Sequence, residues 1–194
     1  SGLLKDLNCL QMKLLVPGIT FTFAACFVSL LGAAEPGDTK PPYLDPAQPV
    51  EKRVEDLRSR MTLEEKIDYI GGVNGFYIRA IERLGVPAIK MSDGPMAARN
   101  DGPTTAYPGG IALAATWDRD MARKIGMALG RDCRARGVNI LLAPAVNIYR
   151  SPLCGRNFEH MGEDPFLAGT LVAPLIQGIQ SQEVLATVKH FAGN

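Results

Sequence analysis

Three short apolar runs recur along the chain, and polar residues follow each run directly. The runs cover residues 86–91, 138–143 and 184–188. Short runs rich in Val, Ile, Leu and Ala are typical of strands, and strands of a parallel sheet are apolar along most of their length because helices cover both faces. The pattern therefore predicts three strands of a parallel sheet.

Two longer stretches between these runs have apolar residues at helical spacing. The first follows Thr116 and ends at Gly137, and the second follows Pro165 and continues to Ile179. An apolar residue at every third or fourth position predicts a helix with one buried face. Strand, helix, strand, helix, strand is the order of parallel βαβ units, so the expected fold class is α/β. Open doubly wound sheets and closed (β/α)8 barrels both have this order.

The stretch before the first strand predicts two further helices. Apolar residues recur at helical spacing from Val54 to Met61, and Thr62 followed by Glu65 has the form of a capping box. In a capping box the hydroxyl and the carboxylate each accept one N–H that would otherwise lack a partner at the start of a helix. The second helix is therefore expected to begin after Thr62 and to end at Gly71, and Ile67 and Ile70 continue its apolar face.

The N-terminal part differs from the rest of the chain. Residues 14–34 carry no charge and end in three small residues before Glu35, which predicts a signal peptide over residues 12–34. About 20 apolar residues also suffice for an uncleaved membrane anchor, but the small-residue end favours cleavage. We therefore expect an exported protein, periplasmic or secreted, with no membrane contact after cleavage. The remaining divisions are an upstream leader over residues 1–11, a proline-rich linker over residues 35–49 and a folded part over residues 50–194.

Composition and charge exclude several classes of protein. The chain is 46% hydrophobic and 21% charged, with 21 Lys and Arg against 20 Asp and Glu, a formal charge of +1. This composition excludes a disordered tail, and the small charge excludes a nucleic-acid binder that works through bulk positive charge. After the signal peptide the chain has two histidines and two cysteines at unrelated spacings, so neither a metal nor a cofactor is expected. Cys133 and Cys154 either pair in an oxidising compartment or remain one buried and one loop thiol.

Polar residues lie at or after the carboxyl ends of the predicted strands, where both α/β architectures place their sites. Asp93 precedes Gly94-Pro95, and its two carboxylate oxygens suit a vicinal diol on a sugar, with an Asx turn or a helix cap as the alternative. Lys189 and His190 follow the third run. Neighbouring residues of a strand point to opposite faces, so this pair serves one site only where the strand ends or bulges.

The segment between the second strand and the second helix, residues 143–165, has no periodic pattern. Long irregular segments in compact domains are usually functional. Arg156 in this segment either donates hydrogen bonds to a substrate or forms an ion pair with Glu159 or Asp164.

A series of short motifs follows in a fixed order from about residue 54 to residue 194. They are residues 61–67, residues 92–95 with Arg99, residues 107–108, residues 114–117, residues 143–148, residues 150–159, residues 162–165 and residues 189–194. In this order and spacing they are specific, and the chain resembles the N-terminal domain of glycoside hydrolase family 3. One departure is Met96-Ala97-Ala98, where the family usually has a glycine before the arginine.

The resemblance implies a partial (β/α)8 TIM-like barrel, with the first strands and helices only, because a complete barrel takes about 250 residues. It also implies a retaining β-glucosidase or exo-β-glucanase that hydrolyses terminal non-reducing β-D-glucosyl residues of β-glucosides or β-gluco-oligosaccharides. The nucleophilic Asp and the acid/base Glu are expected beyond Asn194, so the chain is interpreted as a substrate-holding fragment that is inactive alone. Residues matching those that hold sugar hydroxyls in the family are Asp93, Arg156, Lys189 and His190, with Arg99 as a secondary candidate, while Glu159 and Asp164 are expected to organise their loop.

Other functions remain as alternatives. The N-acetylglucosaminidase branch of the family typically has a proline and a histidine where this chain has Ala192 and Asn194, which disfavours that branch. The β-xylosidase branch typically carries a different motif in place of residues 92–95. A non-catalytic exported sugar-binding α/β module is the alternative from another class.

Overall fold

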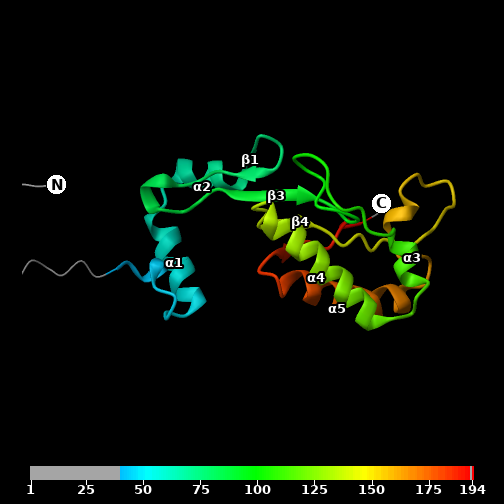
Figure 1. Ribbon diagram of the computed structural model, residues 1–194. Coiled ribbons are helices and arrows are strands. Elements are labelled where there is room, and N and C mark those ends of the chain that lie inside the picture. The colour runs from blue at the N-terminus through cyan, green and yellow to red at the C-terminus, as the bar shows by residue number, and fades with distance from the viewer. Residues whose placement is uncertain (1–39, 193) are drawn as a thin grey trace, which may run out of the picture. The chain divides into compact units, whose positions relative to one another are not determined.

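A computed structural model describes residues 40–192 and 194 of the chain (Figure 1). Its elements belong to one compact unit that runs from Pro41 to Asn194. The predicted leader and signal peptide, residues 1–34, and the first part of the predicted linker lie outside the described residues.

The first two helices form where the sequence predicts them. α1 spans Val50–Arg60 and α2 spans Leu63–Ile70. The capping box at the start of α2 is confirmed, because the Thr62 hydroxyl accepts the Glu65 N–H at 3.2 Å and the Glu65 carboxylate accepts the Thr62 N–H at 2.9 Å. Thr62 and Glu65 thus provide partners for two N–H groups that a helix start leaves free.

The linker prediction differs from the structure over the described residues 41–49. A 3₁₀ turn spans Pro42–Leu44 and packs against α1. The Tyr43 N–H donates to Asp56 at 3.2 Å, and the Tyr43 hydroxyl donates to the carbonyl of Leu84 at 2.7 Å. This part of the proline-rich segment is therefore held in place, because Tyr43 connects it to two other elements.

A five-stranded sheet has the order β1-β2-β3-β4-β5. The three predicted parallel strands are confirmed as β3 (Ile89–Asp93), β4 (Ile140–Leu142) and β5 (Leu185–Ala186), with narrower or shifted ends. Two antiparallel strands that the apolar pattern does not predict, β1 (Gly72–Val73) and β2 (Tyr77–Ile78), make the sheet mixed. Each has two residues, too few to show an alternating pattern.

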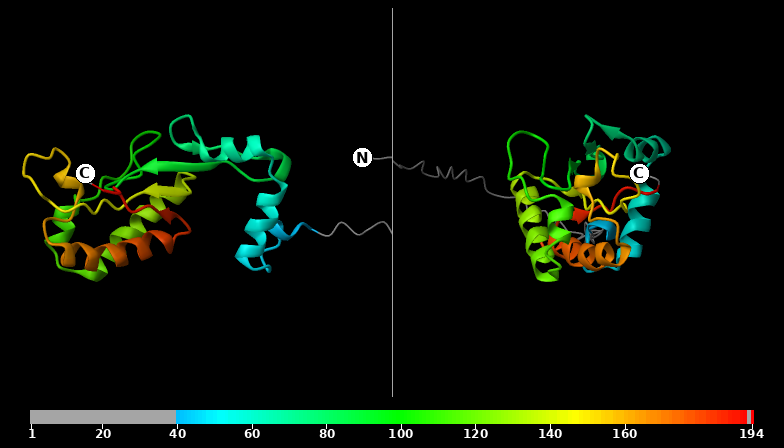
Figure 2. Two further views of the ribbon diagram at one scale, coloured as in Figure 1. Left: turned by 180° about the vertical axis from the view of Figure 1, so that it is seen from behind. Right: turned by 90° about the vertical axis from the view of Figure 1, so that its right-hand side faces the viewer.

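Helices α4 (Arg119–Ala135) and α5 (Pro165–Gln180) connect the parallel strands and lie side by side (Figure 2). Asp118 caps α4, so this helix begins later than the predicted start after Thr116. Asp164 caps α5 by accepting the N–H groups of Phe166 and Leu167. Asp164 therefore acts as the N-cap of α5. A carboxylate is favourable there because the start of a helix is the positive end of its dipole.

The contact between α4 and α5 depends on close approach of their backbones. A Cβ at Gly126 would lie 2.2 Å from the carbonyl oxygen of Leu175, and a Cβ at Gly178 would lie 2.3 Å from the carbonyl oxygen of Arg123. Leu129, Leu171 and other apolar residues of the two helices then fill the core under the sheet, together with Leu141 of β4. The short helix α3 (Gly110–Ala114) precedes α4 and was not predicted.

The apolar face predicted on the first two helices is not buried among the described residues. Val54 of α1 and Ile67 of α2 are each 57% exposed, and Ile70 is 87% exposed. The pattern predicted the helices correctly, and among the described residues these side chains remain largely exposed.

Candidate functional site

The carboxyl ends of the parallel strands bring distant polar residues together. In Figure 1 the arrow of β3 points toward the irregular loops and the C-terminal end of the chain. Asp93 is the last residue of β3, and its Oδ1 accepts a hydrogen bond from Nζ of Lys189 at 2.9 Å. These residues are 96 positions apart in the sequence. The ends of two strands thus bring Asp93 and Lys189 into contact.

A tight loop after β3 brings Arg99 to the other carboxylate oxygen of Asp93. Nη2 of Arg99 donates to Oδ2 of Asp93. The Arg99 N–H bonds to the Asp93 carbonyl at 3.2 Å, and the Asn100 side chain accepts the Asp93 N–H at 3.1 Å. The loop therefore closes on its own starting strand, and it does so with Ala97 and Ala98 buried at the position where the family usually has glycine.

Asp93 is ionised and held between two cations. Burial alone raises the pKa of its carboxyl, but the hydrogen bond and charge of Lys189 and the charge of Arg99 outweigh burial, so the pKa lies below its usual value. Each carboxylate oxygen keeps lone pairs beyond the bond to its cation. Asp93 can therefore accept further hydrogen bonds from a ligand.

Arg156 and Glu159 form a two-point ion pair at the edge of the same cluster. Nε and Nη2 of Arg156 donate to the two carboxylate oxygens of Glu159 at 2.7 and 2.8 Å. Of the two carboxylates that the sequence offered as ion-pair partners, Arg156 pairs with Glu159, and Asp164 caps α5. Glu159 is only 6% exposed, and the hydrogen bond from Arg156 lowers the pKa of its carboxyl.

His190 stands beside Lys189, beyond the end of β5. A bridge between Ala145 and Lys189 continues the sheet past β5, and the peptide bond between Lys189 and His190 is cis. Burial and the charges of Arg156 and Lys189 lower the pKa of His190, so its imidazole is neutral near pH 7. The ring of His160 lies edge-on to it, with 6.1 Å between the ring centroids.

Three residues near the cluster were not among the site residues predicted from the sequence. Asn100 accepts the Asp93 N–H, Asn147 accepts the His190 N–H, and His160 contacts the His190 ring. All three lie in irregular segments, where spacing gives no signal. His160 is 2% exposed, and the buried position lowers the pKa of its imidazole.

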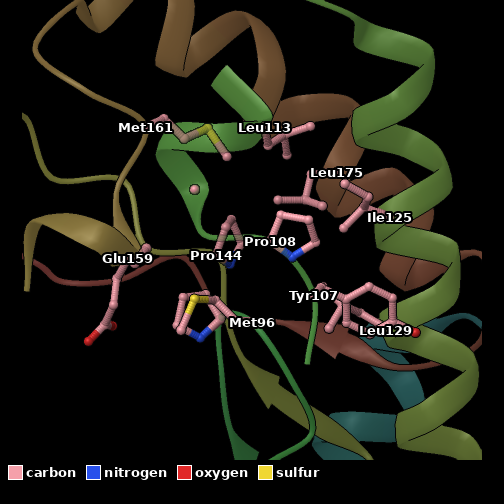
Figure 3. Close-up of a pocket in the computed structure, with 13 residues that line it drawn as sticks. Met96, Tyr107, Pro108, Leu113, Ile125, Leu129, Pro144, Glu159, Met161 and Leu175 are labelled. Atoms are coloured by element: carbon pink, nitrogen blue, oxygen red, sulfur yellow. The ribbon is translucent and has the colours of Figure 1, made fainter. Parts of the chain in front are cut away.

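A small apolar cavity lies next to the polar cluster, between α3, α4, α5 and the loop after β3 (Figure 3). Its volume is about 30 Å³, enough for about one water molecule. Figure 3 shows the Glu159 carboxylate directed away from the proline rings that line the cavity. A sugar ring does not fit there, so this cavity is part of the core and not a substrate site.

The cysteine alternatives are also resolved. Cys133 is buried in α4 and Cys154 is exposed in the loop before Arg156, and both are free. Burial raises the pKa of the Cys133 thiol to about 11. Over residues 40–192 and 194, no group of three or more potential metal ligands is found, and no helix has the length and apolarity to span a bilayer.

Comparison with known proteins identifies the family of this chain. The family model described as the glycosyl hydrolase family 3 N-terminal domain matches residues 74–194. The chain belongs to glycoside hydrolase family 3.

Named relatives and solved structures point to one group within that family. The β-glucosidase BoGH3A of Bacteroides ovatus is 44% identical over 90% of this chain and 26% of its own length. The thermostable β-glucosidase B of Acetivibrio thermocellus is 44% identical over 73% of this chain and 20% of its own length. The structure of a β-glucosidase from Kluyveromyces marxianus aligns with a TM-score of 0.71 and 38% identity, over 73% of this chain and 18% of that one.

A β-glucosidase 3B from Thermotoga neapolitana, solved in complex with α-D-glucose, aligns with a TM-score of 0.66 and 38% identity, over 73% of this chain and 23% of that one. The chain thus spans about a quarter or less of the length of these relatives. The fold prediction of a partial α/β barrel of the (β/α)8 type is confirmed by these structures.

Proposed function

We propose that this chain is the sugar-holding part of a β-glucosidase that removes terminal non-reducing β-D-glucosyl residues. The observation that carries the proposal is the ionised Asp93 between Lys189 and Arg99 at the carboxyl end of the sheet. A carboxylate fixed by two cations can accept hydrogen bonds from two neighbouring hydroxyls, and the cations can donate to the same sugar. Relatives named β-glucosidases, and a relative solved with glucose, support glucose as the sugar.

Two other candidate site residues, Arg156 and Lys189, have hydrogen-bond donors left for a sugar. Nη1 of Arg156 is not used in the bonds to Glu159, so it can donate to a hydroxyl. Glu159 holds the guanidinium in one orientation through two bonds. Lys189 has three ammonium hydrogens, and its bond to Asp93 uses one. These residues can therefore bind the sugar without leaving their present partners.

We infer that Asp93 and Glu159 are not the catalytic carboxyl pair. Retaining hydrolysis needs one carboxylate as nucleophile and one carboxylic acid to protonate the leaving oxygen. Asp93 and Glu159 both have a pKa below the usual value, because cations bind each carboxylate. Neither can hold a proton at neutral pH, so neither suits the role of general acid.

The same observation favours a second candidate, a sugar-binding module without catalytic activity. In that case the chain would bind glucose but no polypeptide containing it would hydrolyse a glucoside. Export through cleavage of residues 12–34 is part of both proposals, and its support is the uncharged stretch of residues 14–34 with its small-residue end.

The proposal predicts the substrate preference of the full-length protein. On a panel of aryl glycosides we expect kcat/KM for the β-glucoside to exceed that for the α-glucoside, the β-xyloside and the β-N-acetylglucosaminide by about 10-fold or more. The aryl release rate under initial-velocity conditions is the measurement. Hydrolysis of none of them, with glucose still bound in calorimetry, would favour the binding module, and preference for the xyloside or the N-acetylglucosaminide would favour another branch.

A further inference from the structure

We infer that Asn147 is a positioning residue that fixes the ring of His190 in the tautomer with a hydrogen on Nδ1 and a free lone pair on Nε2. The inference rests on the proposed function only for the identity of the ligand. The arrangement of Asn147 and His190 stands on the contacts between them.

The backbone places Asn147 opposite His190. The Lys189 N–H donates to the Pro144 carbonyl at 2.9 Å, and the Val146 N–H donates to the Lys189 carbonyl at 2.8 Å. These bonds extend the pairing of β4 with β5 past the ends of both strands. One residue further along each segment, Asn147 and His190 come face to face.

The orientation of the Asn147 amide follows from one bond. The backbone N–H of His190 is a donor in every protonation state, and it lies 2.8 Å from Oδ1 of Asn147. The atom facing this N–H must therefore be the amide oxygen. The amide nitrogen then faces the His190 carbonyl, at 3.4 Å. The Asn147 amide therefore contacts both backbone polar groups of His190. Its oxygen accepts the His190 N–H, and its nitrogen donates to the His190 carbonyl.

The same amide oxygen determines the tautomer of His190. Oδ1 of Asn147 lies 3.2 Å from Nδ1 of the His190 ring. An amide oxygen only accepts, so the favoured tautomer has the hydrogen on Nδ1. In a neutral ring Nε2 is then an acceptor, and among the described residues none forms a hydrogen bond with Nε2 of His190.

The surroundings keep this ring neutral near pH 7. Burial and two positive charges lower the pKa of His190, while two carboxylates oppose them less strongly. The charged or titratable groups that face His190 are Asp93 at the end of β3, Arg156, Glu159 and His160 from the loop before α5, and the neighbouring Lys189.

A second acceptor changes what the cluster can recognise. Arg99, Arg156 and Lys189 supply only donors. Of the two cluster carboxylates Asp93 is the more accessible, because its side chain is 26% exposed and that of Glu159 is 7% exposed. A sugar hydroxyl both donates and accepts. With Nε2 of His190 as an acceptor, an additional hydroxyl can donate its hydrogen; with the other tautomer, Nε2–H would compete with the cations for the hydroxyl lone pairs.

Activity as a function of pH separates positioning from simple stabilisation. In the full-length protein, Asn147→Ala should lower kcat/KM on an aryl β-glucoside by about 10-fold. Asn147→Asp keeps the acceptor oxygen, so kcat/KM at its optimum should stay within about threefold of the wild type. Its added negative charge favours the imidazolium, so the acid limb of the pH profile should move up by about one pH unit.

The matched control is Asn139→Ala. Oδ1 of Asn139 also accepts a backbone N–H, from Lys90 at 2.9 Å, but outside the cluster. This variant should leave the acid limb where it is in the wild type. Activity of Asn147→Ala within twofold of the wild type, or an acid limb that does not move in Asn147→Asp, would overturn the inference.

A spectroscopic measurement tests the tautomer without any substrate. In full-length protein labelled with ¹⁵N-histidine, the His190 signals are assigned by their loss in His190→Gln. Above pH 7 the wild type should show a protonated Nδ1 and an unprotonated Nε2, and Asn147→Ala should show a larger share of the other tautomer. A protonated Nε2 in the wild type overturns the inference, whereas a protonated Nδ1 in a protein that hydrolyses no β-glucoside supports it and removes only the proposed function.

Discussion

Replacing Asp93 by Asn in the full-length protein is expected to lower kcat/KM on an aryl β-glucoside by about 100-fold, equivalent to about 2.7 kcal/mol. The substitution preserves shape but replaces one acceptor oxygen with a donor and removes the charge. The new amide nitrogen would face Lys189 or Arg99, both donors, so one of these contacts is lost as well. Bonds to hydroxyls accelerate hydrolysis only when they strengthen in the distorted, oxocarbenium-like transition state, so we expect kcat to fall and not only KM to rise.

The matched control for Asp93→Asn is Asp68→Asn. Asp68 is exposed on α2, and its side chain forms none of the recorded hydrogen bonds or ion pairs among the described residues. An exposed substitution of this kind usually changes stability by less than about 0.5 kcal/mol, and kcat/KM should change less than about threefold. Equal and small effects of the two substitutions would remove Asp93 from the site.

Removing Arg156 is expected to destabilise the fold as well as the site. Arg156→Ala leaves the Glu159 carboxylate, whose side chain is 7% exposed, without its cation. Because the Arg156 side chain is 43% exposed, solvent screens the pair, and the expected cost at pH 7 is about 1 to 2 kcal/mol, less than for a fully buried pair. Glu159→Gln should cost less, because an amide carries no charge and can still accept from Arg156. The measurement is the free energy of unfolding in denaturant of the full-length protein, monitored with a spectroscopic probe in this domain.

The cost of Arg156→Ala should depend on pH. Arg156 lowers the pKa of Glu159 in the folded state, so the stability from the pair is complete above the ordinary carboxyl pKa of about 4.3 and is lost as pH falls through the lowered folded pKa. The difference in free energy of unfolding between wild type and variant should therefore stay constant from pH 7 to about pH 5 and shrink as the pH falls below about 4.3. A difference that is the same at pH 7 and at about pH 3 would show that the charge on Glu159 is not its origin.

The matched control for Arg156→Ala is Arg134→Ala. Arg134 forms an ion pair with Glu183 in which both side chains are exposed. Exposed pairs contribute between about 0 and 1 kcal/mol, so the stability of this variant should stay close to that of the wild type at both pH values. A loss as large as that of Arg156→Ala would contradict the importance of burial at Glu159.

The parallel part of the fold could be predicted because its pattern is local and repeated. Each of β3, β4 and β5 follows from an apolar run, and the ends of α4 and α5 follow from helical spacing with Gly137 and Pro165 as boundaries. The hairpin of β1 and β2 could not be predicted, since strands of two residues have no measurable period. The predicted start of α4, after Thr116, is two residues too early, because Asp118 is the N-cap. Thr and Asp both cap helices, so the sequence alone does not distinguish the two positions.

The candidate site could be predicted only in part for a similar reason. That Asp93, Lys189 and His190 fall at strand ends follows from the sequence, since parallel strands share their carboxyl edge. The partner of Arg156 depended on the loop conformation, which places Glu159 within reach and assigns Asp164 to a helix end. Asn147 lies in one of the family motifs, residues 143–148, but its contact with His190 could not be predicted, because that contact depends on a backbone pairing that continues beyond the strands.

The most direct test of the proposed sugar-holding role is a crystal structure of the full-length protein with bound glucose. We expect both carboxylate oxygens of Asp93 to lie within hydrogen-bond distance of two neighbouring hydroxyls, with Lys189 and Nε2 of His190 on the same ring. Glucose bound elsewhere, with Asp93, Lys189 and His190 touching no hydroxyl, would contradict the assignment of this cluster.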